Sequence, residues 1–464
     1  MKILHWFRQD LRLHDNPAFS HAAEHTIFPV YIFDETEDHP FAIGSASKWW
    51  LHHSLKSLKD SLLGNLSLYR GSPQDILLKL VEKHKIQKVV WNRCYDPWRI
   101  QQDKIIKVSL RQKGIEVESF NGSLLWEPFD VLKKDGNPYQ VFTPFYQNGC
   151  LKGRPPRKTI ATVTNPIFYH DTNSLSVENL SLLFKQPWEE KFHHHWTVGE
   201  QAAQKRLEVF VEDHLSFYKN GRDFPAQYHV SKLSPYLHFG EISPHQLWEE
   251  INQIEPNLHT ECFLKELGWR EFSHYLLYHF PTLPSQNFQK KFDAFPWENN
   301  ETFLNAWKSG ETGYPIIDAG MRELWQTGYM HNRVRMIVGS FLIKNLLIHW
   351  KKGEQWFWDC LLDADLANNS AGWQWVAGSG ADAAPYFRIF NPTTQAKKFD
   401  PEGIYIKKFV PELKELPIAY LFEPWKAPLS ILEKAKIIIG KTYPHPIVDL
   451  GTSRQKALFY FSTL

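Results

Sequence analysis

The chain has 464 residues, a length that predicts two or three domains instead of one compact core. Lys and Arg total 53 against 51 Asp and Glu, which excludes a global polycation, so any contact with nucleic acid must come from a local basic face. The four cysteines lie far apart without a CxxC pair, which argues against a zinc site or a disulfide scaffold and is typical of a reducing cytoplasm.

The N-terminus shows no targeting signal. Met1 runs directly into a strand-like segment, without the basic and apolar regions of a secretory signal. No apolar run approaches the roughly 20 residues that cross a bilayer. We therefore expect a cytoplasmic protein that has no membrane partner.

The aromatic content is high, since Phe, Trp and Tyr make up 15% of the chain and 19 residues are Trp. Most of these rings are expected to fill the core. Composition alone leaves open whether others stack on a flat ligand or carry electrons.

Short apolar runs and helical patterns alternate through the first 120 or so residues. The runs that predict buried strands are 3–7, 26–33, 66–69, 88–91 and 115–120. Helical spacing is clearest at Trp50, Leu51, Leu55, Leu58 and Leu62. The alternation predicts a doubly wound, Rossmann-like α/β domain with five parallel strands, in which a ligand would lie beyond the carboxyl ends of the strands. No glycine-rich phosphate loop follows any of these strands, so an ordinary nucleotide site is not supported.

Between residues 131 and 198 the periodicity is lost. Prolines at 138, 144, 155, 156, 166 and 187 predict a long connecting segment. Its end carries His193, His194 and His195. Because three adjacent side chains of a regular element point in different directions, a solvated loop is expected here and no metal site.

From residue 199 onward helical patterns dominate. They predict helices over 200–218, 244–254, 264–279, 301–309, 315–327, 332–352 and 354–362. We therefore expect an α/β domain over 1–130, a linker over 131–198 and a large all-α domain over 199–464.

Four segments of the helical region carry polar and aromatic side chains where a packed helix would hold Leu and Ala. The first covers 218–225 and 231–240, where Ser231 and Ser234 suit helix-capping hydroxyls and an anion site at a helix N-terminus. In the second, Glu266 shares a helix face with Trp269 and Arg270, a spacing that, taken alone, favours a surface ion pair beside a half-buried tryptophan.

The third segment joins 307–319 to 331–336, and the fourth covers 363–392. The fourth begins with two Asp, two Asn and two Trp within thirteen residues. Burying so many polar groups is costly unless they meet partners. This segment therefore predicts a site for a polar, flat ligand.

Together with the stretch WFRQDLRLHDNP at 6–17, these segments resemble the photolyase/cryptochrome family over essentially the whole chain, and most closely its cyclobutane pyrimidine dimer photolyases. The motifs are long, ordered and spread over many elements. The resemblance implies an N-terminal antenna domain, a long linker and a C-terminal helical domain that holds FAD. It also implies a monomer that repairs UV-damaged DNA in light.

The resemblance assigns nine residues to FAD binding: Tyr218, Ser231, Leu233, Ser234, Arg270, Asn332, Arg335, Asp363 and Asp365. Where the family often has Thr at the start of the serine segment, this chain has Val230, which removes one hydroxyl near the phosphates. Asn369 would face the flavin nitrogen that gains or loses a proton. An amide there tolerates both the neutral and the anionic reduced flavin.

Three tryptophans match the relay that passes an electron from the protein surface to photoexcited flavin in this family. They are Trp373, Trp350 and Trp297. Core packing is the alternative for each of them taken alone. Their joint match to the family spacing favours the relay.

The branch of the family follows from four positions. Asn332 and Met336 stand where (6-4) photolyases and animal cryptochromes carry histidines that act on the lesion. Plant-type cryptochromes usually replace the tryptophan at the position of Trp375 and favour Asp at that of Asn369, and both residues are retained here. Signalling cryptochromes also tend to carry long C-terminal tails, whereas this chain ends at Leu464. Repair of cyclobutane dimers is therefore the preferred prediction.

In such an enzyme the dimer leaves the DNA stack and enters a pocket beside the flavin. Trp269 and Trp375 would form an apolar wedge around the dimer, and Glu266 would hydrogen-bond it and stabilise its radical anion. The predicted contacts with lesion and DNA are Arg222, Glu266, Trp269, Asn332, Met336, Trp375 and Gln395. Lys397 and Lys398 also fit flanking phosphates, with a solvated face as the alternative.

A second, antenna chromophore is implied, either methenyltetrahydrofolate, a deazaflavin or another flavin. The carboxylate that grips folate in one branch falls near Trp98 here, and a matching Cys-Lys pair is missing around Leu283 and Pro284, which counts against that folate mode. The main alternative function is a blue-light receptor of the cryptochrome class. A flavin dehydrogenase is more distant, since the dinucleotide fingerprint is missing.

Overall fold

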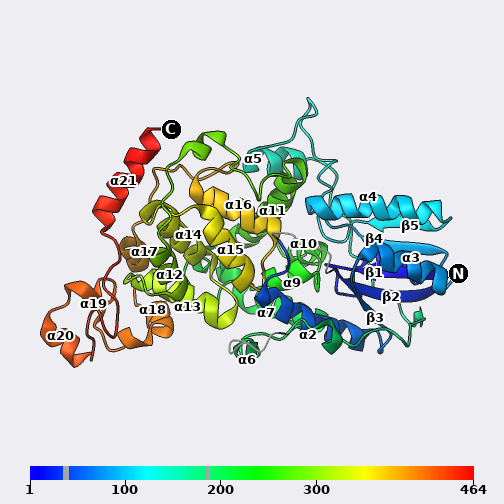
Figure 1. Cartoon of the computed structure of the whole chain (residues 1–464), viewed down its shortest axis with the longest axis horizontal. Helices are drawn as coiled ribbons and strands as arrows, with labels where there is room; N and C mark the ends of the chain where they lie inside the picture. Colours follow the sequence, from blue (N-terminus) through cyan, green and yellow to red (C-terminus); the bar gives the residue numbers. More distant parts are fainter. Residues whose placement is uncertain (35–40, 184–188) are drawn as a thin grey trace.

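The computed structural model describes residues 1–34, 41–183 and 189–464. Figure 1 shows the sheet at one end of an elongated molecule and the C-terminal helices at the other. Five strands fall where the apolar runs predict them: β1 (Lys2–Phe7), β2 (Thr26–Phe33), β3 (Ser67–Arg70), β4 (Lys88–Asn92) and β5 (Glu116–Phe120). They pair in parallel in the order β3-β2-β1-β4-β5.

Helices cover both faces of this sheet, so the doubly wound prediction is confirmed. Alternate residues of β1 point to opposite sides: Ile3 and Phe7 join a core with α1 (Pro17–Ala22) and α2 (Ser45–Ser61). Leu4 and Trp6 join the core formed with α3 (Pro73–Lys83) and α4 (Pro97–Gln112). The strand order reverses between β1 and β4, which is where such sheets place a ligand.

The segment predicted as a linker carries more structure than its prolines indicate. It forms α5 (Phe142–Pro144), η1 (Phe145–Cys150), β6 (Ile167–Phe168), η2 (Glu178–Leu180) and α6 (Glu189–Phe192). β6 pairs in parallel with the start of β2 and so adds a sixth strand. The domain boundaries at 130 and 198 stay predictions.

The helical region begins with α7 (Glu200–Val209) and continues through η3 (Phe210–His214) and η4 (Leu215–Phe217) to α8 (Tyr218–Gly221). The helices that follow are α9 (Ser234–Phe239), α10 (Pro244–Asn252), α11 (Leu258–His279), η5 (Lys290–Ala294), α12 (Glu301–Ser309), α13 (Pro315–Thr327), α14 (Asn332–Ser340), η6 (Phe341–Asn345), α15 (Trp350–Cys360) and α16 (Leu366–Ala377). The last are α17 (Pro392–Phe399), α18 (Ile404–Phe409), η7 (Pro411–Leu413), α19 (Ile418–Leu421), η8 (Pro424–Lys426), α20 (Leu429–Lys434) and α21 (Leu450–Ser462).

One predicted helix is wrong. The expected continuous helix over 332–352 ends at Asn345, and Leu347 takes a left-handed backbone with φ of 55°. His349 then caps α15, its Nδ1 accepting from the backbone N–H of Lys351 at 3.1 Å. The left-handed backbone at Leu347 and the cap at His349 form a turn that interrupts the helix, although the apolar spacing of this stretch suits a continuous helix.

The α/β and helical regions share buried contacts. Arg12 donates from Nη1 to the backbone carbonyl of Gly240 at 2.9 Å, and the Trp50 indole donates to Glu241 at 3.1 Å. The side chains of Arg12 and Glu241 are both buried. Within the described ranges, every helix is too short or too polar to cross a membrane.

Candidate active site

A cavity of about 700 Å³ opens between α8, α9, α11, α14 and α16. All nine residues that the resemblance assigns to the cofactor line it. Five of the predicted lesion contacts also line it: Arg222, Glu266, Trp269, Met336 and Trp375. So do Asn369 and the relay tryptophan Trp373. Trp297, Trp350 and Gln395 are described by the structure but do not line the cavity. Side chains from five separate helices therefore converge on one cavity.

The serine segment forms one wall in a way that differs from the predicted capping. Leu233 precedes α9 as its N-cap residue, and no side-chain hydroxyl caps this helix. Instead the Ser234 hydroxyl donates to Asp363 Oδ2 at 2.5 Å, while Ser231 Oγ accepts from the Leu233 backbone N–H at 3.4 Å. The expectation of two capping hydroxyls is wrong because the Asp363 carboxylate, brought in by the tertiary fold, is a stronger acceptor for Ser234.

Arg335 and Asp363 form an ion pair across the cavity wall. Arg335 Nη2 lies 2.8 Å from Asp363 Oδ2 and 3.1 Å from Oδ1, and its Nε donates to the Met330 carbonyl at 2.7 Å. The guanidinium on α14 and the turn before α16 are thereby fixed to each other.

Asp365 caps α16 and lies between two imidazoles. Its Oδ1 accepts from the backbone and side-chain amides of Asn368 at 2.8 and 2.7 Å. His274 Nε2 lies 3.5 Å from Oδ1 and His238 Nδ1 lies 3.9 Å from Oδ2. Burial by itself raises the pKa of Asp365, but the two histidines and the Asn368 amide hold it well below its ordinary value.

Sequence reasoning assigned no role to these two histidines. His238 Nδ1 and His274 Nε2 are buried without a hydrogen-bond partner in the part of the chain that the structure describes. The spacing of four residues from Arg270 to His274 on α11 was the available signal.

The ion pairs of α11 differ from the expected pairing of Glu266 with Arg270. Glu266 pairs with Arg222 of the segment after α8, and Arg270 pairs with Glu271 at 2.9 Å. Glu271 also accepts from the Leu125 backbone N–H at 2.7 Å, and burial raises the pKa of its carboxyl to about 7. The i,i+4 pairing is wrong because Glu266 meets Arg222, 44 residues away, and Arg270 pairs with its neighbour Glu271.

The lesion-side residues lie at the same cavity. Trp269 and Trp375 are half-buried, as is Met336, whereas Asn332 is exposed at the start of α14. Gln395 lies on α17 outside the cavity, and Lys397 beside it pairs with Glu423 at 3.1 Å. Two aromatic rings and one thioether thus line the same cavity.

Trp373 lies deep in the helical core, in ring contact with Phe357 at 4.9 Å and Trp307 at 6.2 Å between centroids. Trp350 is fully buried, and its indole donates to Asn287 at 2.8 Å. His349 connects Trp350 to Trp297, with centroids 5.4 and 5.0 Å away respectively.

Asn369 stands on the same helix as Trp373, one turn closer to its N-terminus. Its side-chain amide donates to the Glu354 carbonyl at 3.1 Å. The amide is therefore oriented by α15 while its residue lines the cavity.

The α/β region also reaches this cavity. Gln9, which follows β1, and Cys94 and Asp96, which follow β4, line it together with Ser123. Sequence reasoning missed them, although the rule for ligands at the carboxyl ends of strands points to this edge.

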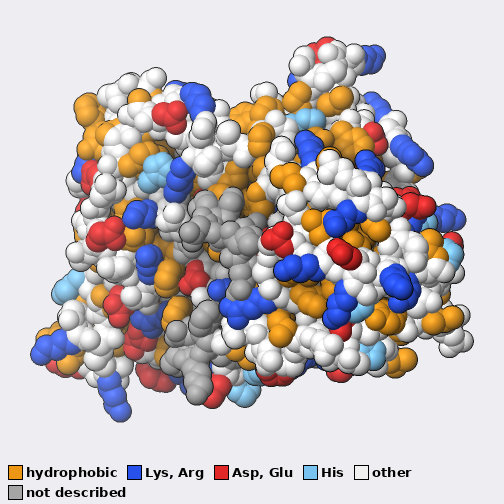
Figure 2. Space-filling view, turned by 45° about the vertical axis from the view of Figure 1, so that its right-hand side comes forward, with side chains coloured by type: hydrophobic (Ala, Val, Ile, Leu, Met, Phe, Trp, Pro, Cys, Tyr) orange, Lys and Arg blue, Asp and Glu red, His pale blue; other side chains and the backbone are white. Residues whose placement is uncertain are grey.

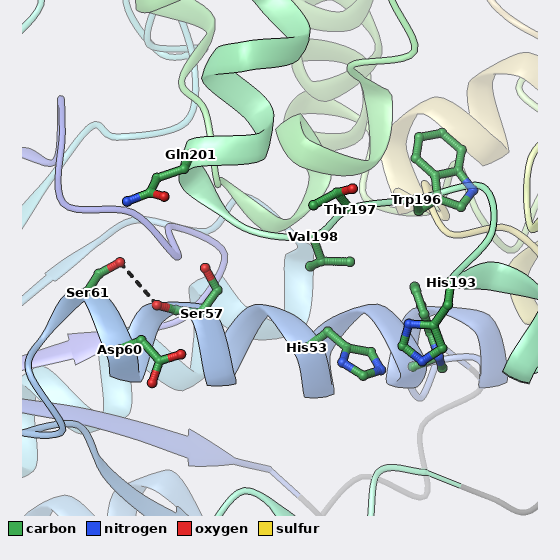
Figure 3. A pocket seen from close by; sticks show the side chains of 10 residues that line it. His53, Ser57, Asp60, Ser61, His193, Trp196, Thr197, Val198 and Gln201 are labelled. Carbon is green, nitrogen blue, oxygen red and sulfur yellow. Dashed lines mark hydrogen bonds between the residues drawn. The ribbon is translucent and has the colours of Figure 1, made fainter.

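A second hollow of about 520 Å³ lies between α2 and the chain before α7 (Figure 3). His193 contacts the rings of Trp49 and His53 there, at 5.0 and 4.7 Å between centroids. His194 and His195 are exposed. Across the described ranges no three His, Cys, Asp or Glu side chains form a metal-binding group.

The cavity chemistry fits FAD. Hydroxyls and guanidinium groups suit its diphosphate and ribityl groups, and aromatic and thioether side chains suit a flat ring.

Comparisons with known proteins identify the family of the chain. Residues 263–463 match the family model for the FAD binding domain of DNA photolyase, and residues 3–162 match the model named DNA photolyase. The deoxyribodipyrimidine photo-lyase of Agrobacterium fabrum is 47% identical over 473 residues, which cover 100% of this chain and 98% of that protein. Cryptochrome-2 of Arabidopsis thaliana is 38% identical and covers 98% of this chain and 78% of its own length.

The crystal structure of a bacterial class III photolyase from Agrobacterium tumefaciens superposes with a TM-score of 0.94 at 46% identity, covering 100% of this chain and 97% of that one. The likeness extends over both the sheet and the helical region. The chain therefore belongs to the DNA photolyase family, and its helical region is the FAD-binding domain of that family.

Proposed function

We propose that the chain is a deoxyribodipyrimidine photo-lyase, which repairs cyclobutane pyrimidine dimers in UV-damaged DNA in light. The observation that carries the proposal is the sharing of one cavity by the flavin residues and by Trp269, Trp375 and Met336. The identity of 47% with a deoxyribodipyrimidine photo-lyase over the whole length supports the same substrate.

The nine cofactor residues divide into three groups by their chemistry. Ser231, Leu233 and Ser234 offer hydroxyl and backbone groups to the diphosphate, with Arg270 as a nearby cation. The Arg335–Asp363 pair fixes the wall beside the flavin, and Asp365 presents a carboxylate to it. Tyr218 and Asn332 complete the set. Bound FAD, when reduced and photoexcited, supplies one electron to the dimer and receives it back.

Asn369 orients its amide toward the flavin nitrogen that carries the changing proton. The Glu354 backbone carbonyl accepts from its Nδ2 at 3.1 Å, which leaves Oδ1 as the atom that the side chain would offer to the flavin. An uncharged amide places no second negative charge beside the reduced flavin, whereas a carboxylate there would disfavour the anionic form of the flavin.

Glu266 holds the dimer through its carboxyl group, and Arg222 keeps that side chain at the cavity wall. The Glu266 carboxylate accepts from the imide N–H of the dimer, and the Arg222 guanidinium beside it stabilises negative charge that develops on the dimer carbonyls. Trp269 and Trp375 stack against the dimer, and each base stacked on an aromatic ring contributes about 1–3 kcal/mol. Asn332 and Met336 line the remaining side of the slot.

Trp373, which lines the cavity, and Trp350 and Trp297 behind it would supply an electron to the flavin. His349 lies between the last two in ring contact with both. Trp297 is half-buried, so it can exchange its electron with a solvent reductant. Gln395, Lys397 and Lys398 on the neighbouring α17 contact the phosphates that flank the lesion.

A second chromophore, the monomeric state and the cytoplasmic location stay predictions. Trp98 stacks on Phe41 at 6.2 Å between centroids, close to the Trp358 ring, and these aromatic side chains support an antenna pigment bound by stacking. Such stacking suits the flat ring of either methenyltetrahydrofolate or a deazaflavin.

The decisive experiment incubates the reduced, flavin-containing protein with DNA that carries thymine dimers, under blue light. We expect restored thymines in light and none in the dark. Flavin that is intact and reduced without any turnover would leave the blue-light receptor as the function, and dark consumption of NAD(P)H would indicate a dehydrogenase.

A further inference from the structure

Trp269 belongs to a stack of three aromatic rings. Phe142 of α5 lies on Trp269 with centroids 3.8 Å apart and planes at 8°, and Tyr146 of η1 lies on Phe142 at 5.5 Å and 11°. Phe142 is 1% exposed, whereas Trp269 is half-buried and lines the cavity. One face of the indole is therefore covered by the segment that connects the sheet to the helices, and the rest is left for the cavity.

Gly268 makes this stack possible. A Cβ at Gly268 would lie 2.6 Å from the ring carbons of Tyr146, closer than real contacts allow. The absence of a side chain lets η1 approach α11 beside Trp269. The stack is thus built into the sequence of α11 as well as into the connecting segment.

The second lesion-side tryptophan is joined to this stack through Asp382. The Asp382 carboxylate accepts from the Phe142 backbone N–H at 3.1 Å. Asp382 has a left-handed backbone with φ of 49°, which an Asp tolerates better than most residues. Two residues later, the Ala384 N–H donates to the Trp375 carbonyl at 3.2 Å. A continuous path of contacts therefore runs from Trp269 through Phe142 and Asp382 to Trp375.

An indole that stands alone in a wide cavity has several rotamers, and a lesion must select one of them at an entropic cost. Stacking with Phe142 restricts Trp269 to one orientation before the lesion arrives. The Asp382 bond restricts the loop after α16 relative to Phe142 in the same way. Fixing both walls selects a ligand of defined thickness.

We propose that Phe142 and Asp382 are positioning residues, which set the spacing and angle between Trp269 and Trp375 so that the slot selects a pyrimidine dimer over undamaged bases. The proposal rests on the proposed function, because it concerns the lesion that this function assigns to the cavity. It gives the connecting segment a part in substrate selection that its prolines and polar residues did not indicate.

The test compares Phe142→Leu with Phe145→Leu in the flavin-containing protein. Phe145 lies on the same segment, but its ring packs on Phe272 and Tyr275 at 5.1 and 4.7 Å and not on Trp269. The dissociation constants are measured for a duplex with one thymine dimer and for the same duplex undamaged. We expect Phe142→Leu to weaken dimer binding about tenfold, with undamaged DNA and flavin content unchanged, and Phe145→Leu to leave the dimer preference as in wild type.

A second pair of variants examines the polar half of the path. Asp382→Ala removes the acceptor and puts strain on a left-handed backbone, whereas Asp382→Asn keeps both an oxygen acceptor and tolerance of that backbone. We expect dimer binding to fall about fivefold in Asp382→Ala and to recover in Asp382→Asn. The double variant Phe142→Leu, Asp382→Ala should lose less than the product of the two single losses, because both act through one path.

Wild-type affinity in Phe142→Leu would overturn the proposal, as would an equal loss of affinity for damaged and undamaged DNA. If Phe142→Leu fails to fold, the two Asp382 variants decide, and identical binding by both would overturn it. The wild-type protein is measured in parallel. Its failure to repair dimers would refute the proposed function, whereas wild-type repair with unaffected variants would refute this inference alone.

Discussion

The six-membered ring of Trp373 lies against the backbone of Gly353, so closely that a Cβ at Gly353 would come within 2.1 Å of it. This contact brings α15 and α16 together under the cavity and fixes the indole plane. Any side chain at Gly353 must displace Trp373 or separate the two helices.

Gly353→Ala is therefore expected to destabilise the protein by about 1–3 kcal/mol, the usual range for overpacking a core. Thermal unfolding measures the loss, and the flavin absorption spectrum reports any movement of Trp373. Gly372→Ala on α16 is the matched control, because its Cβ would meet nothing within 4 Å. The stability of that variant should be unchanged or higher by up to about 1 kcal/mol, since Ala is more favourable than Gly in a helix interior. Equal stability of the two variants would show that the Trp373 contact is unimportant.

Trp373→Phe should separate the supply of electrons from repair. The ring stays apolar and fills most of the same space, but Phe is a much poorer electron donor. Photoreduction of oxidised flavin should fall at least tenfold, while repair by chemically reduced enzyme is retained. Flash absorption spectroscopy measures the first and dimer repair the second. Trp325→Phe serves as control, since Trp325 is 44% exposed and lies outside the predicted relay. A similar loss of photoreduction in both variants would contradict the assigned relay.

Asp363→Asn is expected to release flavin from the purified protein. The change removes the charge that pairs with Arg335 at 2.8 Å and weakens the acceptor of the Ser234 hydroxyl. Leaving Arg335 without its partner in this largely buried pair costs about 3 kcal/mol. The ratio of flavin to protein absorbance measures the effect. Glu412→Gln breaks the more exposed Arg322–Glu412 pair, at 2.7 Å, and should leave the flavin content as in wild type. Full flavin content in Asp363→Asn would exclude this pair from cofactor binding.

Glu241 provides a pH dependence of stability. Burial raises the pKa of its carboxyl to about 8, against an ordinary value of 4.5. The folded protein holds this proton between those values and the unfolded chain does not, so stability must fall as the pH rises through this window, by at most about 1.4 kcal/mol per pH unit.

Glu241→Gln cannot lose a proton and still accepts from the Trp50 indole through its amide oxygen. As the pH rises from about 5 to about 8, the melting temperature of the wild type should therefore fall relative to that of the variant. Comparing the two proteins cancels the titration of other buried groups. A difference that does not change with pH would show that Glu241 is ionised in the folded protein.

Local pattern was sufficient for β1 to β5, because strands that are buried in a parallel sheet are apolar runs whatever surrounds them, but it missed β6 inside the predicted linker. The runs at 3–7 and 26–33 correspond to β1 and β2 nearly residue for residue. It was insufficient for the turn before Trp350. The stretch NLLIHW has helical spacing, and only its environment decides that Leu347 takes a left-handed backbone.

The cavity residues were found through a family resemblance and not through periodicity. Their partners were not found. Arg222 and Glu266 are 44 residues apart, and Ser234 and Asp363 are 129 apart. No rule of local spacing predicts such pairs, so the i,i+4 pairing of Glu266 with Arg270 and the capping role of Ser234 were both wrong.

What the sequence by itself determined is the family and the division into an α/β and a helical region, and it predicted a site for a polar, flat ligand in the segment from Asp363 to Pro392. Tertiary structure alone decided how the two tryptophans of the lesion slot are held. Phe142 reaches Trp269 across 127 residues, as their numbering shows, and Asp382 reaches Phe142 across 240. The physical reason is that stacking and hydrogen bonding act over a few ångströms in space, whereas a sequence records only neighbours along the chain.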